Sequence, residues 1–146
     1  MQRNRALDRL RPENTFVVFY DDDFIPSRFA LAGIERFFKG HPEVAGAHGL
    51  VLADGINGPG IALGDAQQLV DAADTEGEPT SVRILSRTHG LYGCNMAYRV
   101  SMIQGVRFDE RLPFIRGWRT WIWWTLPARW CTRTHSGGAL RGKAGP

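Results

Sequence analysis

Apolar residues follow two different patterns along the first part of the chain. The run from Thr15 to Tyr20 is β-branched and aromatic and is apolar at consecutive positions, which predicts a strand buried on both faces. Val44 to Leu52 predicts a second strand. Between them lies a stripe of helical period, with Ser27 as its predicted cap, formed by Ala30, Leu31, Ile34, Phe37 and Phe38. This order predicts an α/β fold of three layers, with a mainly parallel sheet between helices.

Shorter elements are expected before and after this unit. A helix from Gln2 to Leu10 precedes it, and glycine and proline predict an irregular loop over 53–64. Val82 to Leu85 is a short strand candidate, and the stretch 91–99 leads into a helical turn that Gly105 closes. A helix from Asp65 to Ala73 is expected to turn three apolar residues inward: Leu69, Val70 and Ala73.

Composition places the chain among globular domains. It has 146 residues, of which 43% are hydrophobic and 23% are charged. No apolar run approaches the roughly 18–20 residues of a membrane span, so we expect no transmembrane segment. The basic N-terminus lacks the apolar stretch of a signal peptide, and Cys94 and Cys131 share no metal-ligand spacing. We therefore expect a cytoplasmic protein, with attachment at the membrane periphery left open.

Charge divides the chain into two unlike parts. Residues 1–110 contain all 15 acidic residues, whereas residues 111–146 contain none and are rich in arginine and tryptophan. The net charge of +3 is therefore an average over the two, and we expect no nucleic-acid partner from it. We therefore expect an irregular, basic and tryptophan-rich tail over 119–146 that differs from residues 1–118.

Three consecutive carboxylates follow the first predicted strand: Asp21, Asp22 and Asp23. Adjacent carboxylates repel one another unless a cation neutralises them, and alternate residues such as Asp21 and Asp23 can reach one Mg²⁺ or Mn²⁺ ion. The alternative is a solvated acidic turn before the next helix, where negative charge is favourable. A buried strand before the triplet and a helix after it favour the metal site.

Three blocks of the sequence resemble family 2 glycosyltransferases of the GT-A fold. Phe19–Pro26 resembles their strand-end D-x-D segment, and Gln2–Leu7 resembles the helix that precedes it. Gly93–Arg99, followed by Gly105 and by Phe108–Pro113, resembles a G-x-N-M-A-x-R … G-x-F-D-E-x-L block on the acceptor side. The blocks occur in the family's order. The resemblance implies a partial GT-A-like catalytic domain over 1–118.

The resemblance also implies an activity. A sugar would pass from a nucleotide-diphosphate sugar to a hydroxyl of an acceptor, which could be a glycan, a lipid or a small molecule. Asp21 and Asp23 would hold the divalent metal, and substrate contacts would come from Asp22, Asn95 and Met96. Asn95 could equally be a buried amide satisfied by the backbone. Arg3 either faces phosphates or belongs to a solvated helix face.

Two departures from the family pattern bear on catalysis. The family begins with a strand, a helix and a strand that hold the nucleotide base, and this chain starts after most of them. The family also continues to a G-W-E-D-like segment with a carboxylate that resembles a general base. Here Gly117 and Trp118 are followed by Arg119 and Thr120, which cannot take a proton. A fragment with reduced or no activity is therefore expected.

The composition after Trp118 suggests a reading-frame slip. The codons of Trp121–Thr125, read two bases later, encode Asp, Leu or Met, Val and Asp, which restores an acidic segment. The DNA sequence of the locus tests this hypothesis.

Two other readings of the function remain open. The chain could be a pseudoenzyme remnant that binds nucleotide sugar or metal without turnover. It could also be a phosphotransferase of the haloacid dehalogenase type, which likewise places D-x-D after a buried strand. That motif has Thr or Val where this chain has Ile25, so the phosphotransferase is the weaker of these two alternatives.

Overall fold

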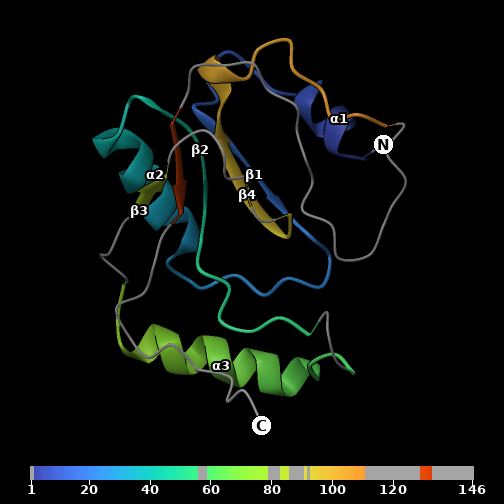
Figure 1. The fold of residues 1–146 in the computed structure, drawn as a ribbon, viewed down its shortest axis with the longest axis vertical. Coiled ribbons are helices and arrows are strands. Elements are labelled where there is room, and N and C mark those ends of the chain that lie inside the picture. The colour runs from blue at the N-terminus through green and yellow to red at the C-terminus, as the bar shows by residue number, and fades with distance from the viewer. Residues whose placement is uncertain are drawn as a thin grey trace, which may run out of the picture.

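A computed structural model of the chain describes residues 2–55, 59–78, 83–85, 91, 93–110 and 129–132 (Figure 1). Its helices are α1 (Gln2–Leu7), α2 (Ala30–Gly40) and α3 (Leu63–Thr75), with a 3-10 turn at Val100–Met102. Its strands are β1 (Phe16–Tyr20), β2 (Val44–His48), β3 (Arg83–Leu85), β4 (Asn95–Arg99) and β5 (Arg129–Thr132). No helix in these ranges is long and apolar enough to cross a membrane.

The strands form one sheet in the order β1-β4-β2-β5-β3. The pairs β1–β4, β2–β4 and β3–β5 are antiparallel, and β2–β5 is parallel. The α/β class is thus confirmed, but the prediction of a mainly parallel sheet is wrong. The reason is β4, which lies between β1 and β2 and runs opposite to both. The two predicted strands therefore do run in the same direction, but they are not neighbours.

Two of the five strands were not expected from the sequence. β4 lies in the stretch 91–99, where small and apolar residues alternate too weakly to predict a strand. β5 lies inside the stretch predicted to be an irregular tail, and that prediction is wrong at Arg129–Thr132, which pairs with both β2 and β3. The rest of 119–146 lies outside the described residues.

Alternate residues of β1 pack on opposite faces of the sheet, as the run of apolar residues predicts. Phe16 and Val18 contact a core cluster under α2, formed by Ile34, Phe38, Val44, Ala47 and Ala97. Val17 and Phe19 belong to a second cluster, with Leu7 of α1, Leu91, Met96, Tyr98, Ile103 and Phe108. Helices therefore cover both faces, α2 on one and α1 on the other (Figure 1). The prediction that β1 is apolar on both faces is confirmed.

Arg99, the last residue of β4, joins the sheet to the end of α2. Its guanidinium donates hydrogen bonds to the carbonyl oxygens of Phe38 (2.6 Å), His41 (2.9 Å) and Val44 (3.1 Å) and lies over the Phe38 ring. The last carbonyls of a helix have no partner within it, and a cation there is also favourable for the helix dipole. The side chain thus fixes the turn that leads from α2 into β2.

Polar contacts join α3 to the turn after β1. Asp74 accepts a hydrogen bond from the Ser27 hydroxyl (2.5 Å) and one from the Arg28 backbone N–H (3.0 Å). It is the one buried residue of the helix. Leu69 is 45% exposed, so the prediction that it faces inward is wrong. The cap position of α2 is Phe29 and not Ser27 as predicted, although the Ser27 hydroxyl, which donates to Asp74, also accepts a hydrogen bond from the Phe29 N–H (3.0 Å) just before the helix.

Candidate functional site

The acidic triplet lies in a tight turn at the carboxyl end of β1. The Asp21 N–H donates to the Cys94 carbonyl (3.2 Å), which extends the pairing of β1 with β4 by one residue. The Asp21 carbonyl accepts from the Phe24 N–H (3.1 Å), which closes the turn. The Asp21 side chain is 39% exposed, and Asp22 and Asp23 are exposed. All three carboxylates can therefore be reached from solvent.

One arginine of α1 connects three distant segments at this edge of the sheet. The Arg3 guanidinium donates to Asp21 Oδ1 (2.5 Å) and to the Gly93 carbonyl (3.2 Å). It also lies 5.6 Å from the centre of the Phe108 ring. Of the two roles considered from the sequence, a solvated face does not describe this placement, and phosphate contact stays a prediction. Arg3 instead orients Asp21 and neutralises part of the charge of the triplet.

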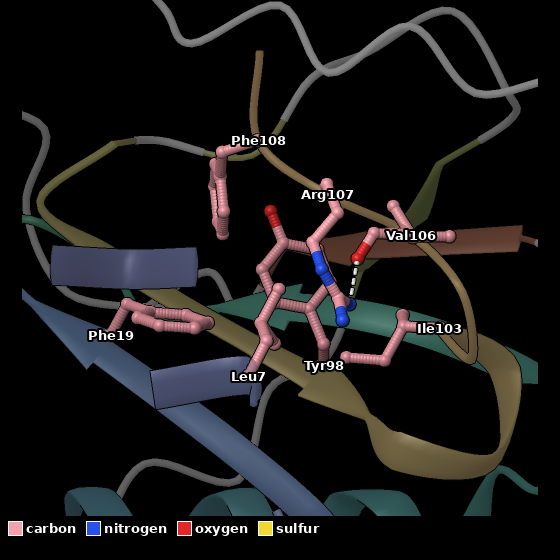
Figure 2. A pocket seen from close by; sticks show the side chains of 7 residues that line it. All are labelled: Leu7, Phe19, Tyr98, Ile103, Val106, Arg107 and Phe108. Carbon is pink, nitrogen blue, oxygen red and sulfur yellow. Dashed lines mark hydrogen bonds between the residues drawn. The ribbon is translucent and has the colours of Figure 1, made fainter. Parts of the chain in front are cut away.

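The neighbouring Asn4 docks α1 onto the segment after β4. Its amide donates to the Phe108 carbonyl (3.0 Å) and accepts from the Phe108 N–H (2.9 Å), as a paired strand would. The same amide nitrogen donates to Glu110 (2.8 Å), and Arg107 pairs with Asp8 (2.9 Å). The three sequence blocks that carry the family resemblance therefore meet in space. A small apolar pocket lies among them, lined by Leu7, Phe19, Tyr98, Ile103, Val106, Arg107 and Phe108 (Figure 2).

Asn95 and Met96 begin β4 directly beside the triplet. Asn95 is 5% exposed, and its Nδ2 atom approaches Gly49 so closely that a Cβ there would stand at 2.7 Å. Met96 is completely buried, and its sulfur accepts a hydrogen bond from the Tyr98 hydroxyl. The Met96 side chain is thus part of the core, and the substrate contact expected at Met96 stays a prediction. Asn95 is mostly buried, and its amide occupies space that a side chain at position 49 would fill.

The thiol of Cys94 lies in a partly buried environment close to several carboxylates. Burial raises the pKa of its thiol to about 11, and the negative charge of Asp21 acts in the same direction. Asp54 and Asp23 raise it further. A neutral thiol is not a nucleophile. Asp54 follows β2, and sequence reasoning missed it because a single carboxylate in a glycine-rich loop carries no pattern.

The carboxylates of the triplet are the side chains here that could hold a hard divalent ion. In the described ranges, no three acidic, histidine or cysteine side chains are grouped closely enough to hold a metal by themselves. Mg²⁺ commonly takes one or two protein carboxylates and completes its shell with phosphate oxygens and water. Asp21 and Asp23 are suited to that role, since both are at least partly exposed and both follow the same strand.

The positions of the expected general base, Arg119 and Thr120, lie outside the described residues. Comparison of the chain with models of known families, with curated proteins and with solved structures gives no match. The interpretation of the site therefore depends on its own residues and geometry.

Proposed function

We propose that this chain takes part in glycosyl transfer from a nucleotide-diphosphate sugar, with Mn²⁺ or Mg²⁺ at the acidic triplet. The observation that carries the proposal is the contact of Arg3 with both Asp21 and Gly93. It joins segments that are 18 and 90 residues apart in sequence. The blocks that resemble family 2 glycosyltransferases by sequence are thus also one structural unit.

The position of the triplet supports a role in binding diphosphate. It stands at the carboxyl end of β1, beside the start of β4 and the end of β2, where Asp22 and Asp23 are exposed. A metal held there supplies Lewis-acid stabilisation of the departing diphosphate. Asp23 is exposed and has the freedom to reach such an ion, while Arg3 and the turn to Phe24 hold Asp21 in place.

The remaining polar groups suit recognition of the substrate. Asp22 is exposed next to both proposed ligands and can accept hydrogen bonds from sugar or ribose hydroxyls. Asn95 is fixed at the start of β4, and its role in substrate contact depends on a movement of the Gly49 segment, which now lies against its amide. The acceptor would approach from the same edge of the sheet.

A binding protein without turnover is the second candidate. Arg119 and Thr120 stand where the family pattern has a carboxylate base, and neither can remove a proton from an acceptor hydroxyl. Binding of the donor needs only the triplet and its surroundings, whereas transfer needs that base as well. Binding and transfer must therefore be measured separately.

Calorimetric titration of the whole chain tests the proposal. We expect Mn²⁺ to bind more tightly when a nucleotide-diphosphate glucose is present, with uridine, guanosine and thymidine as the bases to compare. Asp23→Asn should weaken this binding by about tenfold or more, because it removes a charged ligand. Asp23 is preferable to Asp21, since a change at Asp21 also breaks the Arg3 ion pair.

Asp65→Asn is the matched control, because Asp65 is an exposed carboxylate in the first turn of α3, away from the triplet. It should leave Mn²⁺ binding unchanged. Equal loss in both variants, or no binding of Mn²⁺ with any of the three donors, would reject the proposal. Release of nucleoside diphosphate in the presence of acceptors then distinguishes an enzyme from a binder.

A further inference from the structure

The outer edge of the sheet at β1 carries backbone groups without partners. β1 ends the strand order, and Figure 1 shows no strand of the described ranges beyond it. Thr15 accepts a hydrogen bond from Val100, and Asp21 donates one to Cys94. In an antiparallel pair the residues that bond to one neighbour alternate with those that bond to the other. Odd-numbered residues of β1 therefore bond to β4.

It follows that Phe16, Val18 and Tyr20 direct their N–H and C=O groups away from β4. Within the described part of the chain, none of these groups meets a hydrogen-bond partner. The strand is also free of charge and of proline, and all five of its residues favour β structure. An uncharged open edge of this kind is a template for pairing with another strand.

We propose that this edge pairs with the same edge of a second copy of the chain, antiparallel and about a two-fold axis at Val18. In that register Val18 faces Val18 of the second copy, and Phe16 faces its Tyr20. All three are residues with outward backbone groups, so every unpaired N–H and C=O of the edge finds a partner. A shift by one residue would bring outward groups against inward ones. A shift by two residues would place Asn14, whose N–H already bonds to Arg11, or Asp22, which lies outside the strand, opposite an outward group.

The side chains suit the same register. Phe16 would stand across from an aromatic ring, Tyr20, and Val17 across from Phe19, which are favourable cross-strand pairs. The paired stretch itself contains no charged residue, and Asp21 at its end would face the uncharged Thr15 of the second copy. The two acidic triplets would lie at opposite ends of the paired strands. The pairing itself uses only residues of β1, none of which has a part in the proposed function.

Amide hydrogen exchange of the whole chain tests the pairing and contains its own control. The amides of Val17 and Phe19 bond to β4 and should be protected at every protein concentration. The amides of Phe16, Val18 and Tyr20 should be unprotected in dilute protein. They should exchange about fivefold or more slowly at roughly 1 mM, because a pairing of this small size is held together by mass action.

Sedimentation over the same range should show a species of twice the 16.3 kDa chain mass. Val18→Pro removes an outward N–H and no bond to β4, so it should abolish the dimer and keep the fold by circular dichroism. Val17→Pro removes a bond to β4 and should unfold the strand. A chain that stays monomeric, or forms aggregates of no fixed size, would overturn the proposal. Protection of all five amides in dilute protein, or of none at any concentration, would overturn it as well.

Discussion

Arg3 and Asn4 are neighbours on α1, yet they hold the site by different means. Arg3 makes charge-assisted contacts with Asp21 and Gly93, whereas the Asn4 amide copies the backbone pattern of a strand toward Phe108. The sequence shows that both residue types can make such bonds. Their partners could not be predicted, because the contacts of Asn4 span 104 residues and no local pattern encodes them.

Replacement of Arg3 measures how much its contacts with Asp21 and Gly93 contribute to the free energy of unfolding. Arg3→Gln should lower the free energy of unfolding by about 1 kcal/mol, since the pair is partly exposed and is screened by solvent. Urea denaturation provides the value. Arg11→Gln is the control, because Arg11 is 77% exposed and lies 3.9 Å from Glu13, and it should change almost nothing. A loss of the same size in both variants would contradict a specific role for Arg3.

The raised pKa of Cys94 predicts slow alkylation. At pH 8 the thiolate fraction of a group with a pKa of about 11 is about 100-fold below that of a thiol at 9.0. Mass spectrometry of the Cys94 peptide after iodoacetamide treatment should show this difference between native and urea-unfolded protein. Equal rates in the two states would show that the thiol is not shielded.

The same pKa shift sets a direction for stability against pH. The folded chain holds the thiol proton more tightly than the unfolded chain. The resulting contribution to the free energy of unfolding is fully present below about pH 9. It is lost as the pH rises from about 9 to about 11. In Cys94→Ser, urea midpoints measured over this range should fall less steeply than in the original chain. Parallel curves would contradict the shift.

At the scale of elements, periodicity predicted each helix and missed the strand that organises the sheet. α1, α2 and α3 all overlap their predicted ranges, and so do β1 and β2. β4 was missed since its residues are buried on both faces and include Ala97, whose small side chain gives no alternation. The wrong prediction of a mainly parallel sheet followed from that omission, because two parallel strands with a helix between them were expected to be neighbours.

Asp74 joins α3 to Ser27 and Arg28, which precede α2, and this makes α3 sensitive to one substitution. Asp74→Ala should reduce the free energy of unfolding by about 1–3 kcal/mol, because Ser27 and the Arg28 N–H both lose their acceptor. Asp71→Ala on the same helix should cost about 0.5 kcal/mol or less, as Asp71 is exposed. Similar urea midpoints for the two variants would show that Asp74 does not hold the helix.

The whole molecule is stabilised by two apolar clusters on opposite faces of the sheet, and Phe38 is central to the one under α2. Its ring contacts Phe16 and Phe37, lies beneath Arg99 and is 4% exposed. Phe38→Ala should cost about 3–5 kcal/mol, a large part of the stability of a small domain. Leu31→Ala, at a residue 57% exposed on the same helix, should cost about 0.5 kcal/mol or less. Thermal unfolding of both variants provides the comparison.

The candidate site was predictable in part at this scale. The sequence placed Asp21, Asp22 and Asp23 at the end of a buried strand, and the structure has them there. It could not show that Arg3 occupies one face of Asp21, or that Asp54 adds to the negative charge around Cys94. Both facts depend on how distant segments pack, which residue patterns do not specify.

The order of the strands has a consequence for synthesis on the ribosome. β4 separates β1 from β2 in the sheet but is translated after both of them, and β5 is later still. Until Asn95–Arg99 has left the exit tunnel, the nascent chain presents unpaired apolar strands on both sides of a missing partner. Such intermediates are those that chaperones bind and that associate wrongly in crowded cells. We therefore expect the yield of soluble protein to depend on the speed of translation between His48 and Asn95.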